Sequence, residues 1–77
     1  MLDGFLLLHS CRVKLPHEAI KSKLSGENIS EVREEDLVYF KNLVELDLSD
    51  NSIGMESLAN LVSLERLDLQ YNNLDHL

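Results

Sequence analysis

Residues 43–53 read LVELDLSDNSI, and residues 64–74 read LERLDLQYNNL. Both stretches carry leucine at the first, fourth and sixth positions, asparagine at the ninth, and isoleucine or leucine at the eleventh. The whole pattern recurs at one fixed step, and Leu37 and Phe40 recur at that same step as Leu58 and Leu61. A fixed period of this kind indicates a repeat architecture, in which each unit buries its apolar face against its neighbours.

The spacing has a physical reason. Leu46 and Leu48 alternate, so both side chains lie on one face of a short strand, and successive strands are expected to stack in parallel about 4.8 Å apart. Asn51 and Asn72 follow the strands, where an amide can satisfy backbone groups of its own coil and of the neighbouring coil. The residues predicted to build this framework are Leu43, Leu46, Leu48, Asn51, Ile53, Leu64, Leu67, Leu69, Asn72 and Leu74.

A decayed unit is predicted before the two clear ones. Leu24 and Ile29 align with Leu48 and Ile53 at a slightly longer step, while Ser22 stands where the pattern expects leucine. We therefore divide residues 17–77 into a degenerate repeat at 17–36 and clear repeats at 37–57 and 58–77. The segment 16–21 is ambiguous, because Pro16 favours a helical turn and the alignment favours a strand.

Short helices are predicted opposite the strands. Residues 34–40 place acids in a first turn, which a helix dipole favours, and residues 55–61 are their equivalent one period later. Each segment has one to two turns of α or 3-10 helix. Leu37 and Phe40 are expected to face inward, with Val38 as a further candidate.

The two ends of the chain differ in the pattern. Residues 5–9 and 11–15 look like strands, and the second alternates apolar and basic residues, so residues 1–16 are predicted to form an N-terminal β cap. No capping pattern follows residue 74. We expect either a piece of a longer solenoid, or an open C-terminal edge that another chain covers, with self-association as one outcome.

Composition restricts the partners. The net charge of −7 repels phosphate backbones and anionic membranes, so neither nucleic acid nor membrane is an expected partner. The apolar run at residues 5–8 is too short for a membrane span or a signal peptide. The single cysteine, Cys11, forms no internal disulfide, which favours an intracellular setting, with the cytoplasm first and the cilium or nucleus as alternatives.

The exposed face of the strands is the predicted partner-binding surface. Its rows would be Lys21–Glu45–Arg66, which is self-neutralising, and Lys23–Asp47–Asp68, which sets two acids side by side. Tyr71 is the aromatic candidate for an energetic anchor. The alternative reading is a solvated strand face without a partner. The predicted partner-binding residues are Glu45, Asp47, Ser49, Arg66, Asp68, Gln70 and Tyr71.

Catalysis is not expected. Asp47 and Asp68 would lie on an open face, whereas catalytic carboxylate pairs need a pocket that separates their pKa values. His9 and Cys11 fall short of the four converging ligands of a zinc site, and Gly4, Gly26 and Gly54 are isolated rather than part of a phosphate loop. The sequence therefore predicts no enzyme, no metal and no cofactor.

The stretch at 43–53 resembles the leucine-rich-repeat proteins, most closely the short intracellular kind with about 21–22 residues per unit. This resemblance implies an α/β fold, a right-handed solenoid with parallel strands on its concave face, and protein–protein recognition on that face. A further resemblance, to the X-ray radiation resistance-associated proteins, rests on Phe5, Leu6, Leu7, His9, Cys11, Lys14 and Pro16 followed by Glu35, Asp36, Phe40, Ser49 and Asn51. The alternative function is a structural cap or scaffold segment of a longer repeat protein, of the cilium- or axoneme-associated kind.

Overall fold

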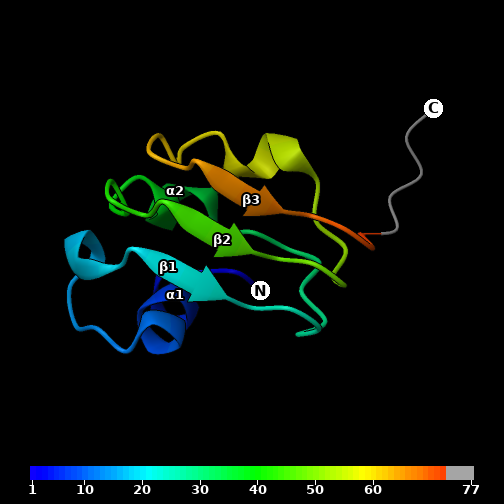
Figure 1. Ribbon diagram of the computed structural model, residues 1–77, viewed down its shortest axis with the longest axis horizontal. Coiled ribbons are helices and arrows are strands. Elements are labelled where there is room, and N and C mark those ends of the chain that lie inside the picture. The colour runs from blue at the N-terminus through cyan, green and yellow to red at the C-terminus, as the bar shows by residue number, and fades with distance from the viewer. Residues whose placement is uncertain (73–77) are drawn as a thin grey trace.

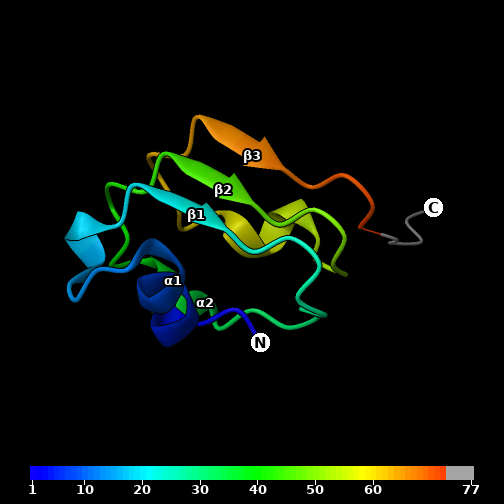
Figure 2. The ribbon, with the colours of Figure 1, turned by 60° about the horizontal axis from the view of Figure 1, so that its bottom comes forward.

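The computed structural model describes residues 1–72 of the 77-residue chain. Three short strands, β1 (Lys21–Lys23), β2 (Glu45–Asp47) and β3 (Arg66–Asp68), form one parallel sheet in that order. The helices lie together on one side of the sheet, and the other side carries no helix among the described residues (Figures 1 and 2). The framework is therefore a coil that returns to the sheet once per repeat.

The predicted strand register is confirmed. Lys21 pairs with Glu45, and Glu45 pairs with Arg66, so these three residues form one row across the sheet. The next row contains Ser22, Leu46 and Leu67, which are the inward positions of the three strands. Ser22 is only 2% exposed, so it takes in β1 the inward position that leucine takes in β2 and β3.

Segment 16–21 combines both readings. A 3-10 turn, η1 (Pro16–Glu18), begins at the proline, and β1 starts shortly after that turn ends. Pro16 suits the first turn because its fixed φ matches a helix and its missing N–H is not needed there. The helical signal of Pro16 and the strand signal of the repeat alignment therefore belong to two neighbouring elements, η1 and β1.

The helical segments opposite the strands are short, as predicted. They are α2 (Glu34–Leu37) and the 3-10 helix η2 (Met55–Leu58). Leu37 and Phe40 are buried, but Val38 is 40% exposed and does not face the core. Val38 is the C-cap residue of α2, and its position on the outer side follows from the helical spacing of the two buried residues.

The predicted N-terminal β cap is wrong. Residues 4–11 form an α-helix, α1 (Gly4–Cys11), and no strand occurs at 5–9 or 11–15. The Asp3 carboxylate caps the helix by accepting a hydrogen bond from the Leu6 N–H at 2.9 Å. Arg12 ends the helix in the left-handed conformation, with φ of 56°. The alternation at Cys11, Val13 and Leu15 is therefore the exit from a helix, and Leu15 is 51% exposed.

Helix α1 packs against β1 at the outer edge of the sheet (Figure 2). Leu2 precedes it and is fully buried, and its backbone forms a parallel bridge with Val32 through hydrogen bonds of 2.7 Å and 2.8 Å. The Ser10 and Ser22 hydroxyls lie 2.6 Å apart and join the helix to the strand. The N-terminal segment thus covers the first strand, although by a helix rather than by strands.

The core is most completely buried in the first two coils and extends to the helical side of the third. Its buried apolar residues include one or more from the N-terminal segment and from every described coil: Leu2, Leu7, Ala19, Leu24, Ile29, Leu37, Phe40, Leu43, Leu46, Leu48, Ile53, Leu58 and Leu61. Leu64, Leu67 and Leu69 pack against this core but are only partly buried. Leu74, the last residue of the predicted framework, lies outside the described residues.

Asn51 joins the first two coils. It is 6% exposed, and its Oδ1 accepts hydrogen bonds from the N–H groups of Glu27 and Ile29 at 3.1 Å and 3.0 Å. Its Nδ2 donates to the carbonyls of Leu24 and Leu48 at 2.9 Å and 3.0 Å. An amide is needed here because the site requires both a donor and an acceptor.

Candidate functional site

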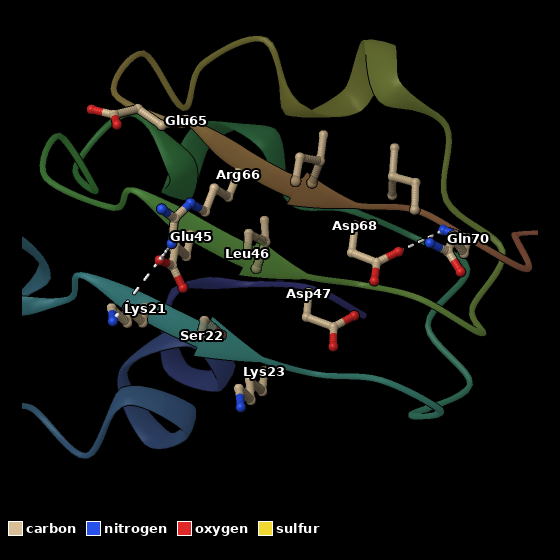
Figure 3. Close-up of a pocket in the computed structure, with 12 residues that line it drawn as sticks. Lys21, Ser22, Lys23, Glu45, Leu46, Asp47, Glu65, Arg66, Asp68 and Gln70 are labelled. Atoms are coloured by element: carbon tan, nitrogen blue, oxygen red, sulfur yellow. Dashed lines mark hydrogen bonds and ion pairs between the residues drawn. The ribbon is translucent and has the colours of Figure 1, made fainter.

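The strand face is the side of the sheet that points away from the helices. Alternation along each strand places charged side chains on it and Ser22, Leu46 and Leu67 on the opposite, inward side. An open concavity of about 550 Å³ lies over the three strands, and its lining includes all six charged residues of this face (Figure 3). These residues are Lys21, Lys23, Glu45, Asp47, Arg66 and Asp68.

Glu45 is the centre of the first row of the strand face. Its Oε1 lies 2.7 Å from Arg66 Nη1 and 3.9 Å from Lys21 Nζ (Figure 3). The Glu45 side chain is 27% exposed, whereas those of Arg66 and Lys21 are 79% and 67% exposed. One carboxylate therefore holds two cations in place, and both cations keep most of their surface open to a partner.

The second row is organised around the Asp47 carboxylate. Asp47 Oδ1 accepts hydrogen bonds from the Ser49 hydroxyl at 2.7 Å and from the Ser49 N–H at 3.0 Å. These two bonds and the charge of Lys23 lower the pKa of Asp47 below its usual 3.8, against the opposing effect of burial. Asp47 is consequently a fixed anion at neutral pH, directly across from Asp68 on the next strand.

Asp68 repeats the geometry of Asp47 one coil later. Its Oδ1 accepts a hydrogen bond from the Gln70 N–H at 3.0 Å (Figure 3). A carboxylate that accepts from the N–H two residues ahead forms an Asx turn, which starts the bend after a strand. Sequence reasoning missed this local role, although the repeated Leu-Asp-Leu followed by a polar residue was its signal.

The other predicted partner-binding residues lie near the end of the strands. Gln70 contributes to the lining of the concavity. The hydroxyl of Ser49 lies 2.9 Å from that of Ser25. Tyr71 does not line the concavity. It lies in the turn after β3, is 79% exposed and has φ of 61°.

The conformation of Tyr71 belongs to the repeat. Gly26 and Asp50 occupy the same place in the two preceding coils and have φ of 67° and 58°. The turn thus requires a left-handed residue just before the asparagine position, and this constraint takes Tyr71 out of the strand face where the sequence placed it.

The chemistry of the strand face is that of an ionic surface. Among residues 1–72, no group of three or more His, Cys, Asp or Glu residues is arranged to hold a metal ion. No helix in the same part of the chain is long and apolar enough to cross a membrane. The three strands present three cations and three anions on this face, and Glu65 also lines the concavity.

The comparisons with known proteins agree with the repeat pattern. The family model described as Leucine Rich Repeat matches residues 42–62 and residues 63–77. No curated protein and no solved structure gave a match, and nothing in the comparisons supports the narrower resemblance to X-ray radiation resistance-associated proteins. The matched segments contain β2 and β3 with the helix between them, so these segments are similar to leucine-rich repeats.

Proposed function

We propose that this chain is a non-catalytic protein-interaction module that binds another protein with the concave strand face of a right-handed solenoid. The observation that carries the proposal is the row in which Glu45 positions Lys21 and Arg66. Both cations pair with a partly buried anion yet remain mostly exposed, so both are accessible to a partner carboxylate. The leucine-rich-repeat family is generally an interaction fold, which agrees with this role.

The proposed partner surface carries acids opposite the Lys21–Glu45–Arg66 row and a base opposite the Asp47–Asp68 pair. Two neighbouring carboxylates repel each other, and a cation from the partner removes that repulsion. Charge pairing of this kind gives orientation and specificity more than affinity. We further propose an intracellular setting, which the single free thiol of Cys11 supports.

An affinity capture with matched charge reversals tests the proposal. Arg66→Glu reverses a charge on the strand face, and Lys41→Glu makes the same net change at an exposed residue outside it. Quantitative mass spectrometry should find proteins that the wild type and Lys41→Glu both retain from a cell extract and that Arg66→Glu loses. Equal retention by Arg66→Glu of every enriched protein would contradict the placement on the strand face.

A second candidate function is structural, and the partly buried Leu64, Leu67 and Leu69 favour it. In this reading the chain is a scaffold segment, of the cilium- or axoneme-associated kind, whose third coil packs against further repeats. Fusing a consensus leucine-rich repeat after residue 77 should then raise the free energy of unfolding. An unchanged unfolding free energy in the fusion would remove this candidate.

A further inference from the structure

We infer that the cleft between α1 and α2 is a second docking site, which takes a bulky apolar side chain of a basic peptide. This helix-side cleft is lined by residues of α1, of α2 and of the turns that follow them: Gly4, Phe5, Leu8, Pro16, Asp36, Tyr39 and Phe40. Helices α1 and α2 lie on the side of the sheet opposite the strand face (Figure 2), and the cleft shares no lining residue with the concavity over the strands, so it is independent of the proposed function.

The aromatic residues of the chain gather at this cleft. The sequence contains two phenylalanines, two tyrosines and no tryptophan, and three of these aromatic residues are Phe5, Tyr39 and Phe40. Phe40 is 1% exposed and belongs to the core, whereas Phe5 is 82% and Tyr39 is 65% exposed. Exposed aromatic side chains around an apolar floor are the composition of an interface centre rather than of a solvated surface.

The size of the helix-side cleft limits what can enter it. Its volume is about 180 Å³, below the roughly 300–1,000 Å³ of small-molecule sites. A metabolite would therefore leave much of its surface in water. One aromatic or branched apolar side chain, presented by a peptide whose backbone stays outside, fits this space better.

The floor of the cleft is fixed before anything binds. The Asp36 carboxylate accepts a hydrogen bond from the Gly4 N–H at 2.9 Å, which ties the start of α1 to α2. Leu7 of α1 and Leu37 of α2 are both fully buried, so each helix is anchored in the core from its inner side. A preorganised cleft does not spend binding energy on ordering its own walls.

The charge around the helix-side cleft selects a basic partner. Glu34, Glu35 and Asp36 are the first three residues of α2. Asp36 lines the cleft, and the only cation paired with these acids among residues 1–72 is Arg33. Arg33 Nε lies 3.6 Å from Glu35 Oε2 and 3.8 Å from Asp36 Oδ1, which leaves Glu34 without an ionic partner in this part of the chain. A second copy of this chain, with a net charge of −7, is disfavoured at such a surface, whereas lysine or arginine beside the entering side chain is favoured.

A peptide titration of the full chain, followed by NMR, tests the inference. The probe is a short synthetic peptide with one central phenylalanine, a pair of lysines on each side of it, and glycine and serine elsewhere. Its addition to the nitrogen-15-labelled chain should shift the amide signals of α1 and α2 in a saturable way. A probe with glutamate in place of lysine, or alanine in place of phenylalanine, should bind about tenfold more weakly or not at all.

Variants of the chain give the matched control. Phe5→Ser and Tyr39→Ser remove exposed side chains, so the fold should survive, and each should weaken the probe about tenfold. Val62→Ser removes a side chain that is similarly exposed, at 77%, but lies outside the cleft, and it should leave the affinity unchanged.

Four results of these titrations would overturn the inference. These are no saturable shift at millimolar peptide, shifts confined to the strand face, equal binding of the glutamate probe, and a loss in Val62→Ser as large as in Phe5→Ser. Binding of the chain to neutral phosphatidylcholine vesicles as strongly as to the phenylalanine–lysine probe would also overturn the inference, because Phe5 and Tyr39 would then be a lipid contact.

Discussion

The units at residues 43–53 and 64–74 share one sequence pattern and differ in burial. Leu46 and Leu48 of the first unit are 2% and 0% exposed, whereas Leu67 and Leu69 of the second are partly exposed. Strand β2 lies between two strands, and β3 has one neighbouring strand among the described residues. The pattern therefore determines the course of the backbone, and the neighbours determine how much each leucine stabilises the fold.

The largest expected effect on the free energy of unfolding comes from truncating the equivalent leucines, Leu46 and Leu67. Leu46→Ala should cost about 2–5 kcal/mol of unfolding free energy, because it leaves a cavity in a fully buried layer. Leu67→Ala should cost about half as much, because the side chain that it truncates is already partly in contact with water. Urea unfolding of the two variants, followed by circular dichroism, measures the difference. Equal losses would mean that the third coil is as well packed in solution as the second.

The two asparagines give the next test. Asn51→Ala should cost about 2–3 kcal/mol, since it leaves buried groups such as the Ile29 N–H and the Leu24 carbonyl unpaired. Asn72 accepts from the Ile53 N–H at 2.7 Å and donates to the Leu48 carbonyl at 2.8 Å, but its surroundings are only partly buried. Asn72→Ala should therefore cost about 1 kcal/mol, because water can replace the lost bonds. Hydrogen exchange of the Ile29 and Ile53 amides in the two variants would localise the losses.

Much of this framework could be predicted because it depends on local periodicity. The row Lys21–Glu45–Arg66 followed from counting along the repeat, even across the longer step to a unit without its leucine. The hydrogen bonds that join Asn51 to the neighbouring coil could be predicted because its amide carries both a donor and an acceptor. Both inferences needed only the spacing of residues and the chemistry of one side chain.

The N-terminal segment could not be predicted in the same way. Residues 5–8 are a continuous apolar run, which has neither a period of two nor a clear helical period. The capping signal of Asp3 was present, but the partner of Gly4 on α2, Asp36, lies in a distant part of the sequence. The helix is set by tertiary packing against β1, and no window of the sequence contains that information.

The candidate functional site was only partly predicted, because some of its features depend on turn conformation and tertiary packing. The rows of the strand face followed from the register, but Tyr71 was placed on it although the turn there needs a left-handed residue. The helix-side cleft was missed entirely, because Phe5 and Tyr39 come from segments that are far apart in the sequence and meet only in the fold.

The ion pair between β2 and β3 should have a smaller effect than either class of framework residue. Glu45→Gln should cost about 0.2–1 kcal/mol at low salt, because its partners are largely exposed. The loss should fade at about 1 M NaCl, where the Debye length is about 3 Å. Glu65→Gln is the matched control, because this exposed carboxylate has no ion pair among residues 1–72. A salt-independent loss in Glu45→Gln would show that packing, and not charge, joins the two strands at this row.

The smallest expected effect is on the pKa of Asp47, through a substitution in the turn after β2. Ser49→Gln gives the β2 turn the residue of the β3 turn, Gln70, and removes the hydroxyl that donates to Asp47. The pKa of Asp47 should rise toward 3.8 but stay below it, since the backbone N–H of residue 49 and the charge of Lys23 still favour the anion. A lowered pKa contributes stability that is present above the unfolded value of 3.8 and is lost as pH falls through the folded value. In the variant this contribution should therefore be smaller, and its loss should still begin near 3.8 but be complete at higher pH than in the wild type.

NMR titration of the Asp47 carboxyl carbon measures this shift directly. Ser25→Ala is the control, because it removes the hydroxyl next to Ser49 without touching the Asp47 carboxylate. An unchanged Asp47 midpoint in Ser49→Gln would mean that the backbone N–H alone holds the anion. The turns after β2 and β3 would then be electrostatically equivalent, and the difference between the two repeats would reduce to the burial of their leucines and asparagines.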